Sequence, residues 1–551
     1  MIKKLTIGVA IIAVLILVGV LYFKRATGPS DSATLVPSDA VFFLNIIDVP
    51  RSALRWQQTA LAKIAQEPEM KAFLERPLAR LQSQPGFSEA MTILGSLKPG
   101  SLFVAFTSVT ASNADVLVGF QYWGTRADYD QAIARMRKQL PGAASETTKE
   151  MHGSNEILIS THDTHSVYSA SIGRWGLIAT NLEALKAALD RATGTLKDPT
   201  LATNPRFATV LSKLNADPDA TVFVQPEKAL NALLDVGSSV GAQPVPSQLE
   251  SLRSTEAIGA TWRLDGLVQR DAIFALRKSS PPFPALDHKI IDLTSKDTIA
   301  VVEASLRTEG LADLVKSAAP QAAEIPEILA LIDLATQAYG QDAGLVANWP
   351  AGQTAPSVFA ALDVKDKDKA TQFLTQVLQF APNHTTSTTN GLTLYSIPSG
   401  NPIASPTIAQ TDSFLFVGLD PATVVQIASR QPGIPSLSAT TDFALVADSL
   451  KKSNEMFAFI DSKIVFERAY NALRPIIIFG ATVMPNIGAV VDTTKLPQTD
   501  TITKHLTPMT LSQTISAEGT LIESSGPLTI TQTLFAVLSA AGAASPRLLG
   551  R

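Results

Sequence analysis

The segment Gly176-Leu-Ile-Ala-Thr-Asn181 has a counterpart in Leu415-Phe-Val-Gly-Leu-Asp420, and the fold class follows from this repetition. Each segment is a short apolar run that ends at Asn or Asp. These side chains accept hydrogen bonds from the free backbone N–H groups at the start of a helix. Pro421 stands at the first helical position, where its missing N–H costs nothing. Both segments therefore predict a strand followed by a capped helix.

A second match lies at the beginning of each half of the chain. Leu35-Val-Pro-Ser-Asp39 precedes an apolar strand, as Leu293-Thr-Ser-Lys-Asp297 does 258 positions later. Because matching segments recur in the same order in the two halves, the sequence predicts two copies of one large module, residues 35–285 and 286–551. The period is far longer than the repeats of about 20–50 residues in solenoid arrays.

Each module is predicted to close with a β-hairpin, through Asp265-Gly266 in module 1 and Ser525-Gly526-Pro527 in module 2. In module 1, three strands at 155–160, 166–170 and 176–180 have connections short enough for antiparallel pairing. Helical segments are mixed among the strands instead of alternating strictly with them. We therefore predict an α+β fold, with largely antiparallel sheets covered by helices on one face.

The N-terminal region contains an uncharged run of 19 residues, Leu5 to Phe23, between two pairs of basic residues. A helix of this length spans about 28 Å, close to the hydrocarbon thickness of a bilayer. The alternative is a cleaved signal peptide, whose apolar region is usually about 7–15 residues long. We therefore predict an uncleaved transmembrane anchor in residues 1–25. A linker rich in Ser, Thr, Gly and Pro follows at 26–34.

The start of module 1 resembles a bacterial family. Its opening at 35–39, together with Gln66-Glu-Pro-Glu-Met-Lys-Ala-Phe-Leu74, is similar to the Leu-Pro-Ala-Asp opening and the helix signature of anchored, exported proteins known only as a domain of unknown function. The resemblance covers most of the chain after the anchor, but its sharp motifs lie in module 1. The resemblance implies a location in the cell envelope. Together with the anchor, it leads us to predict a single-pass protein of the bacterial inner membrane, with the bulk of the chain in the periplasm. It implies no catalytic residues.

The composition excludes several classes of function. The formal charge is −4, and no block of Lys and Arg occurs beyond the first 25 residues, so nothing indicates nucleic-acid binding. The chain has no cysteine, which excludes disulfides, thiolate metal sites and cysteine nucleophiles. Gly-rich phosphate-binding loops are absent from the sequence. We therefore predict no cofactor.

Possible metal ligands cluster at His162, Asp163 and His165. Two imidazoles and a carboxylate can hold zinc and leave one position open. The alternative is a solvated turn between two strands. Module 2 has Ser399-Gly-Asn-Pro-Ile-Ala-Ser405 in this region and no ligands, so we favour the turn and predict no metal site.

Two further patterns are compatible with catalysis or cation binding. Gly237-Ser-Ser-Val-Gly241 matches the G-x-S-x-G pattern of serine nucleophiles, but the residues at 228–234 predict a helix where that motif needs a strand. The alternating charges at 365–369 are interpreted as a solvated first helical turn. A hydrolase would need acid, base and nucleophile groups in one cleft. We therefore predict that the protein is not an enzyme.

The segment from Pro475 to Val491 carries no charge, and Pro485 and the glycines interrupt it too often for a membrane span. It is either the packed core of a helix hairpin or a surface that contacts lipid, an apolar ligand or a partner protein. Like the helices at 59–74, it is not shared by the two modules, so we expect a module-specific function in these two segments. The candidate contact residues are Ile476, Ile477, Ile478, Phe479, Val483 and Met484.

The leading hypothesis is a noncatalytic, membrane-anchored envelope protein that binds or scaffolds another envelope component. It contacts the membrane through residues 5–23. The alternatives are a carrier or sensor of an apolar ligand or lipid, and a hydrolase whose site is not recognised.

Overall fold

The chain divides into two compact units. The computed structural model describes residues 31–83, 92–93, 95–110, 114–139, 146–162, 165–231, 251–278, 285–306, 326–398, 405–430, 435–483 and 492–533. Unit 1 combines residues 1–281, 475–505 and 516–523, and unit 2 combines residues 282–474, 506–515 and 524–551. Unit 1 therefore contains segments from the C-terminal half of the chain, and the predicted modules 35–285 and 286–551 stay a prediction.

The predicted anchor at 5–23 lies outside the described residues and stays a prediction. Within the part of the chain that the structure describes, no helix is both long and apolar enough to cross a membrane.

The predicted linker ends earlier than expected. Residues 32–34 belong to the 3₁₀ helix η1 (Ser32–Leu35), because Ala33 is buried in the core of unit 1 beside Leu35.

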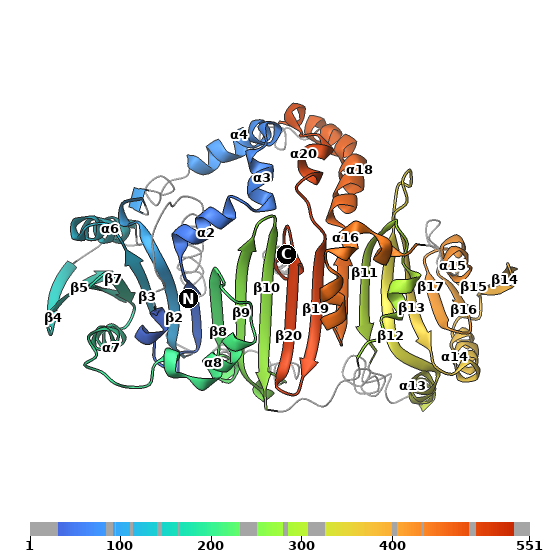
Figure 1. The fold of residues 1–551 in the computed structure, drawn as a ribbon, viewed down its shortest axis with the longest axis horizontal. Coiled ribbons are helices and arrows are strands. Elements are labelled where there is room, and N and C mark those ends of the chain that lie inside the picture. The colour runs from blue at the N-terminus through green and yellow to red at the C-terminus, as the bar shows by residue number, and fades with distance from the viewer. Residues whose placement is uncertain are drawn as a thin grey trace, which may run out of the picture. The chain divides into compact units, whose positions relative to one another are not determined.

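The strands of unit 1 form an antiparallel sheet (Figure 1). They are β1 (Phe42–Ile46), β2 (Pro99–Val109), β3 (Ala114–Tyr122), β4 (Glu146–His152), β5 (Asn155–His162), β6 (His165–Ile172), β7 (Trp175–Ala179), β8 (Ala220–Val224), β9 (Thr255–Asp265) and β10 (Val268–Arg277). Their order across the sheet is β4-β5-β6-β7-β3-β2-β1-β8-β9-β10. The part of β20 (Gly519–Gly526) that belongs to unit 1 pairs with β10.

The strands of unit 2 pair in a matching order. They are β11 (Thr298–Ser305), β12 (Tyr339–Asn348), β13 (Ser357–Val364), β14 (Thr385–Thr389), β15 (Leu392–Ser396), β16 (Thr407–Gln410), β17 (Phe414–Gly418), β18 (Met456–Ile460) and β19 (Met509–Ser516). The order β14-β15-β16-β17-β13-β12-β11-β18-β19 repeats the order from β4 to β9. The duplication itself stays a prediction, which superposition of the two halves tests.

Helices and short 3₁₀ segments occupy the connections. In unit 1 they include α2 (Val49–Trp56), α3 (Ala60–Gln66), α4 (Pro68–Gln82), α6 (Arg126–Gln139), α7 (Leu182–Thr193), η2 (Leu201–Thr203), α8 (Pro205–Ser212), η3 (Ser251–Ser254), η7 (Thr493–Lys495) and α20 (Thr499–Thr503). In unit 2 they include η4 (Lys289–Leu293), α13 (Pro326–Ala338), α14 (Lys367–Gln379), α15 (Pro421–Ala428), η6 (Leu437–Ala439), α16 (Thr441–Ala444) and α17 (Ala447–Lys452). Residues of α18 (Ser462–Val483) belong to unit 2 up to Arg474 and to unit 1 from Pro475.

Both predicted caps are confirmed. The side chain of Asn181 follows β7 and accepts hydrogen bonds from the backbone N–H groups of Glu183 and Ala184, at 2.9 and 3.2 Å. Asp420 follows β17 and accepts one from Thr423 N at 2.8 Å. The strand-to-helix connection therefore has the same chemistry in both units.

Helices cover both faces of the sheet in unit 1, so the prediction of one covered face is wrong. Successive side chains of a strand point to opposite faces. Phe103 of β2 packs in a core with Leu185 of α7, whereas its neighbour Leu102 packs in a second core with Tyr129 of α6. Because both faces carry apolar side chains, each face requires its own covering layer.

Helices also cover both faces of the sheet in unit 2, as the neighbouring side chains of β17 show. Phe416 lies in a core with Val424 of α15, and the adjacent Leu415 packs with Ala370 of α14. The coarser prediction, an α+β fold with antiparallel sheets and helices, is confirmed.

The first predicted hairpin is confirmed. The C-terminal half also has a hairpin, β19 with β20, but the predicted position of its turn at 525–527 is wrong. β9 and β10 meet at a turn that contains Gly266, whose φ of 63° suits glycine. In the C-terminal half, β19 ends at Ser516 and β20 already begins at Gly519. The intervening Ala517 and Glu518 have none of the Asn-Gly or Asp-Gly chemistry that marks a tight turn, so the sequence carried no signal for it.

Candidate contact surface

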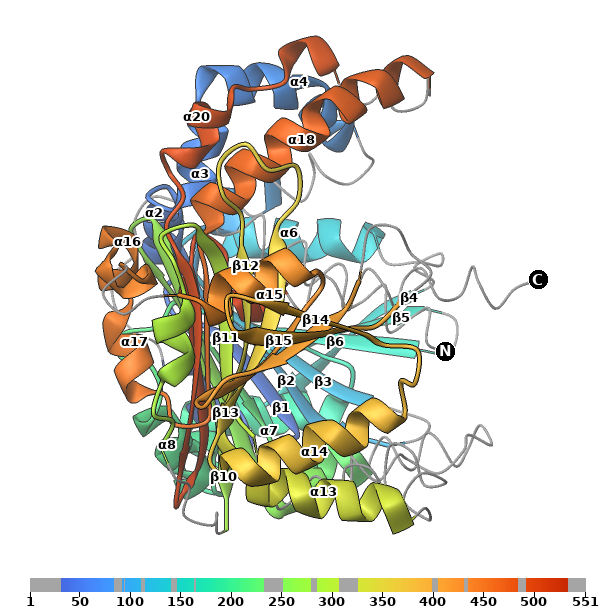
Figure 2. The same cartoon turned by 90° about the vertical axis from the view of Figure 1, so that its right-hand side faces the viewer.

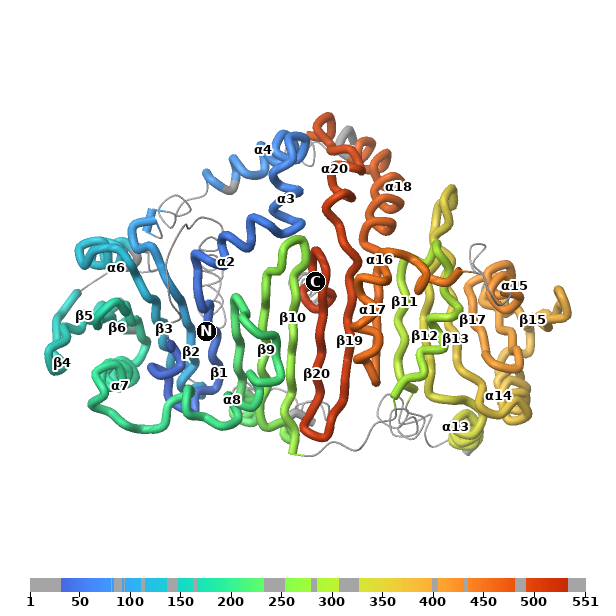
Figure 3. Tube along the Cα trace, viewed as in Figure 1, coloured from blue at the N-terminus to red at the C-terminus, as the bar shows by residue number. Residues whose placement is uncertain are grey.

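A polar seam joins α3 and α4 to a distant segment of unit 1. Thr59 starts α3, and its hydroxyl accepts a hydrogen bond from Ala62 N at 3.3 Å. The extended backbone of Glu67 ends α3, and Pro68 then starts α4. The opposite side is the segment 492–505, which contains η7 and α20 and lies next to α4 (Figure 3). The residues of the polar seam are Glu67, Glu69, Glu75, Arg76, Asp492, Lys495, Gln498, Thr501, Lys504 and His505.

Glu67 has two basic partners. One of its carboxylate oxygens lies 2.9 Å from Lys504 Nζ and 2.7 Å from His505 Nε2. The hydrogen bonds from Lys504 and His505 lower the pKa of Glu67 below its ordinary value. Glu67 is therefore ionised at neutral pH and links the end of α3 to the end of α20.

Glu69 and Glu75 make the corresponding links from α4. A carboxylate oxygen of Glu69 accepts from Gln498 N at 2.7 Å and from Thr501 Oγ1 at 2.9 Å, so it links α4 to the start of α20. Glu75 lies 2.9 Å from Lys495 Nζ. The pKa of each carboxyl is lowered, by the backbone N–H of Gln498 for Glu69 and by Lys495 for Glu75.

The polar seam is expected to weaken in acid. Its glutamates have lowered pKa values in the folded chain, so their stabilisation is complete above the ordinary value of 4.5 and is lost as the pH falls through the folded values. Backbone amides of α4 and α20 should therefore exchange with solvent faster below about pH 4.5, after correction for intrinsic rates. Amides of α8, which the neutral Asn204 caps, serve as the control. At pH 3, about 1.5 units below the ordinary glutamate pKa of 4.5, part of this stabilisation should already be lost. Unchanged protection of the α4 amides at pH 3 would therefore contradict this role.

The C-terminal end of α18 is apolar and exposed. The exposed fractions are 63% for Ile476, 36% for Ile477, 43% for Ile478 and 70% for Phe479. Figure 2 shows this end of α18 extending past α4. Because successive helical positions differ by about 100°, these four side chains point in four directions around the helix. We call these four residues the apolar tip.

Both interpretations of the uncharged segment stay predictions, because residues 484–491 lie outside the described residues. A packed helix hairpin requires buried side chains, and all four side chains of the tip are exposed. Of the other candidates, Val483 is the last residue of α18, and Met484 lies outside the described residues. That the tip contacts another component stays a prediction.

The other sequence candidates are placed only in part. β5 ends at His162 and β6 begins at His165, and these two residues are register partners. Asp163 and the segment 237–241 lie outside the described residues. Where the structure is described, no group of three or more His, Cys, Asp and Glu side chains is arranged to hold a metal ion. Nothing in the described residues supports a metal site.

The charged segment at 365–369 is confirmed as a solvated helix start. Asp366 precedes α14 and accepts hydrogen bonds from the backbone N–H groups of Asp368 and Lys369, both at 3.0 Å. The side chain of Asp366 is exposed. Its carboxylate therefore serves as a helix cap.

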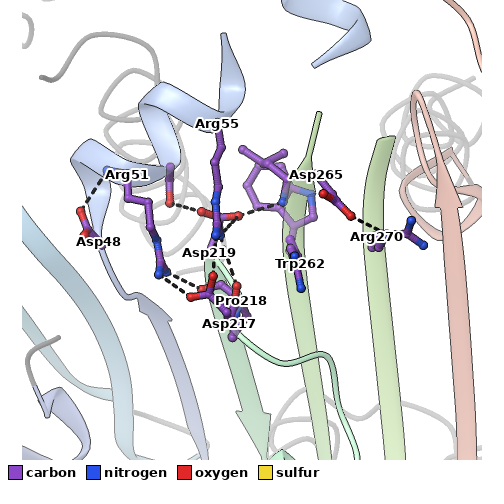
Figure 4. A network of polar contacts seen from close by, with 12 residues as sticks. Asp48, Arg51, Arg55, Asp217, Pro218, Asp219, Trp262, Asp265 and Arg270 are labelled. Atoms are coloured by element: carbon purple, nitrogen blue, oxygen red, sulfur yellow. Dashed lines mark hydrogen bonds and ion pairs between the residues drawn. The ribbon is translucent and has the colours of Figure 1, made fainter. Parts of the chain in front are cut away.

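Sequence reasoning missed a polar network that docks α2 (Figure 4). Arg51 and Arg55 both form ion pairs with Asp217, each at 2.5 Å, and Arg55 Nη1 lies 3.3 Å from Asp219 Oδ2. Asp219 is 1% exposed and also accepts from Ser52 Oγ and Leu264 N, each at 2.8 Å. The hydrogen bond from Arg55 lowers the pKa of Asp217. The network holds α2 on the start of β8, and α3 and α4 follow from α2.

A second missed network lies in unit 2. His288 Nδ1 is 2.8 Å from Glu303 Oε2, and the other oxygen of Glu303 accepts from Ile290 N at 3.1 Å. Burial would lower the pKa of His288, but the hydrogen bond and charge of the fully buried Glu303 raise it above its ordinary value. These contacts hold η4 against β11.

Comparisons with known proteins identify no family. No family model matches the chain, and no curated protein matches it. The chain is similar to the solved structure of TP0453 in crystal form III, with 11% identity and a TM-score of 0.27 over 49% of this chain and 86% of that chain. For TP0453 in crystal form IV, the identity is 12% and the TM-score 0.26 over 46% of this chain and 81% of that chain. Likenesses with TM-scores this low carry no argument about function.

Proposed function

We propose that this protein is a noncatalytic, membrane-anchored envelope protein that binds another envelope component through the apolar tip of α18. The observation that carries the proposal is the exposure of four consecutive apolar side chains, with Ile476 at 63% and Phe479 at 70%. Burial of a side chain of this size contributes about 1.5–3 kcal/mol. A cluster left in water is therefore unfavourable unless another component covers it.

The proposed anchor would hold the start of unit 1 near a membrane. In the proposal, residues 5–23 span the inner membrane and the two units lie in the periplasm. η1 begins at Ser32, so the linker that remains is 26–31. Six extended residues reach about 20 Å, which keeps the start of unit 1 close to the bilayer.

We also propose that the two halves arose by duplication. The matching strand orders and the caps Asn181 and Asp420 support it. The cores add a matching aromatic pair. The ring centroids of Phe207 and Phe223 are 5.2 Å apart in unit 1, and those of Phe443 and Phe459 are 5.4 Å apart in unit 2.

The proposed contact is tested with single cysteines, because the chain has none of its own. In native membranes opened on the periplasmic side, Phe479→Cys should react with a membrane-impermeant maleimide about tenfold more slowly than Phe380→Cys. Phe380 is a matched control, since it is 66% exposed at the end of α14. After denaturation the two rates should be equal. Equal rates before denaturation would show that nothing covers the tip.

A further inference from the structure

The apolar tip presents apolar surface on every side of its helix. Ile476, Ile477, Ile478 and Phe479 are consecutive, and each is at least 36% exposed. A protein groove accepts one stripe of a helix, built from positions three and four residues apart. A groove that accepted Ile476 and Phe479 would therefore leave Ile477 and Ile478 in water. An environment that surrounds the helix covers all four.

Polarity changes along α18 at Arg474. The residues before it include Lys463, Glu467 and Arg468, whereas no charged residue occurs from Pro475 to Val483. A helix that enters a bilayer by one end has this division, with basic groups at the headgroups and apolar groups in the hydrocarbon. The apolar part is about 13 Å long, which fits within one leaflet of about 15 Å.

The tip and the proposed tether belong to the same unit. Residues 475–505 are part of unit 1, as is η1, whose side chains are packed in the core of that unit. The polar seam also ties the segment 492–505 to α3 and α4. A bilayer anchored at residues 5–23 would therefore lie within about 20 Å of the unit that carries the tip.

From these observations we infer that the component covering the apolar tip is the surface of a lipid bilayer, into which the end of α18 inserts from one side. This inference rests on the proposed function and names the component. Arg474, the residue immediately before the uncharged part of α18, would lie at the headgroups and favour anionic lipids.

Proteoliposomes test the inference without any other protein. The full chain is reconstituted in vesicles of phosphatidylcholine and phosphatidylglycerol that contain lipids with a doxyl quencher in the acyl chain. A fluorophore on Phe479→Cys or Ile476→Cys should be quenched, and one on Phe380→Cys should keep its emission. Quenching should weaken when the vesicles contain phosphatidylcholine alone. The second tip position keeps the test valid if one label disturbs the helix.

The outcomes separate the inference from the proposed function. If position 479 is protected in native membranes but is not quenched in the vesicles, the tip is covered by a protein or a soluble apolar ligand, and the lipid inference is overturned while the proposed function stands. If position 479 is neither protected nor quenched, both are overturned. Quenching at 476 and 479, together with protection in native membranes, supports both.

Discussion

Replacing Phe223 with alanine is expected to lower the free energy of unfolding, measured at β8, by about 3–5 kcal/mol. The ring is fully buried and meets Phe207 edge-on, with centroids 5.2 Å apart. Because the interior of a protein is close-packed, the neighbours can move only part of the way into the space that the ring leaves. The lost burial and the remaining cavity both reduce stability.

Native-state hydrogen exchange of the full chain in increasing urea measures this effect for each strand. Phe459→Ala is the matched variant in unit 2, because Phe459 is also fully buried and lies 5.4 Å from Phe443. It should act on β18 as Phe223→Ala acts on β8. A loss below about 1 kcal/mol at β8 would mean that the site collapses around the smaller side chain.

Arg55→Met is expected to cost about 3 kcal/mol of stability in the contact between α2 and β8. Asp219 is 1% exposed, and Arg55 supplies its positive partner at 3.3 Å. Methionine preserves the length of the side chain but leaves a buried carboxylate without its counter-charge. The expected cost is at the low end for buried pairs because the side chain of Arg55 is 23% exposed.

The double variant Arg55→Met/Asp219→Asn separates the charge effect from packing. The neutral amide no longer requires a counter-charge, so adding Asp219→Asn should recover part of the stability that Arg55→Met removes. Denaturant unfolding and hydrogen exchange of α2 report the recovery. If the double variant is less stable than both single variants, loss of packing and hydrogen bonds accounts for the effect instead of the unpaired charge.

The parts of the fold that could be predicted from the sequence depend on hydrogen bonds between residues close together in the chain. Asn181 and Asp420 cap helices through N–H groups two or three residues away, so residue type and spacing were sufficient to predict them. The turn at Gly266 was equally local. β4 was not predicted, because its sequence Glu-Thr-Thr-Lys-Glu-Met-His has no apolar alternation, and its pairing with β5 forms it.

Ion-pair and hydrogen-bond partners that are distant in the chain could not be predicted from the sequence. Glu67 and His505 are separated by 438 positions, and Arg55 and Asp219 by 164. Charged residues are common on surfaces, and no spacing rule identifies which of them meet after folding. The polar seam and the network on α2 therefore emerged only from the tertiary structure.

For the apolar tip, the sequence alone determined an uncharged segment that does not suit a membrane span. Only the tertiary structure decided that its first four isoleucine and phenylalanine side chains are exposed and not in a core. The physical reason is that hydropathy is a property of each residue, whereas burial depends on what other parts of the chain cover it. The same dependence applies to the sheets, where strand alternation placed apolar side chains on both faces and tertiary packing decided which helix covers each face.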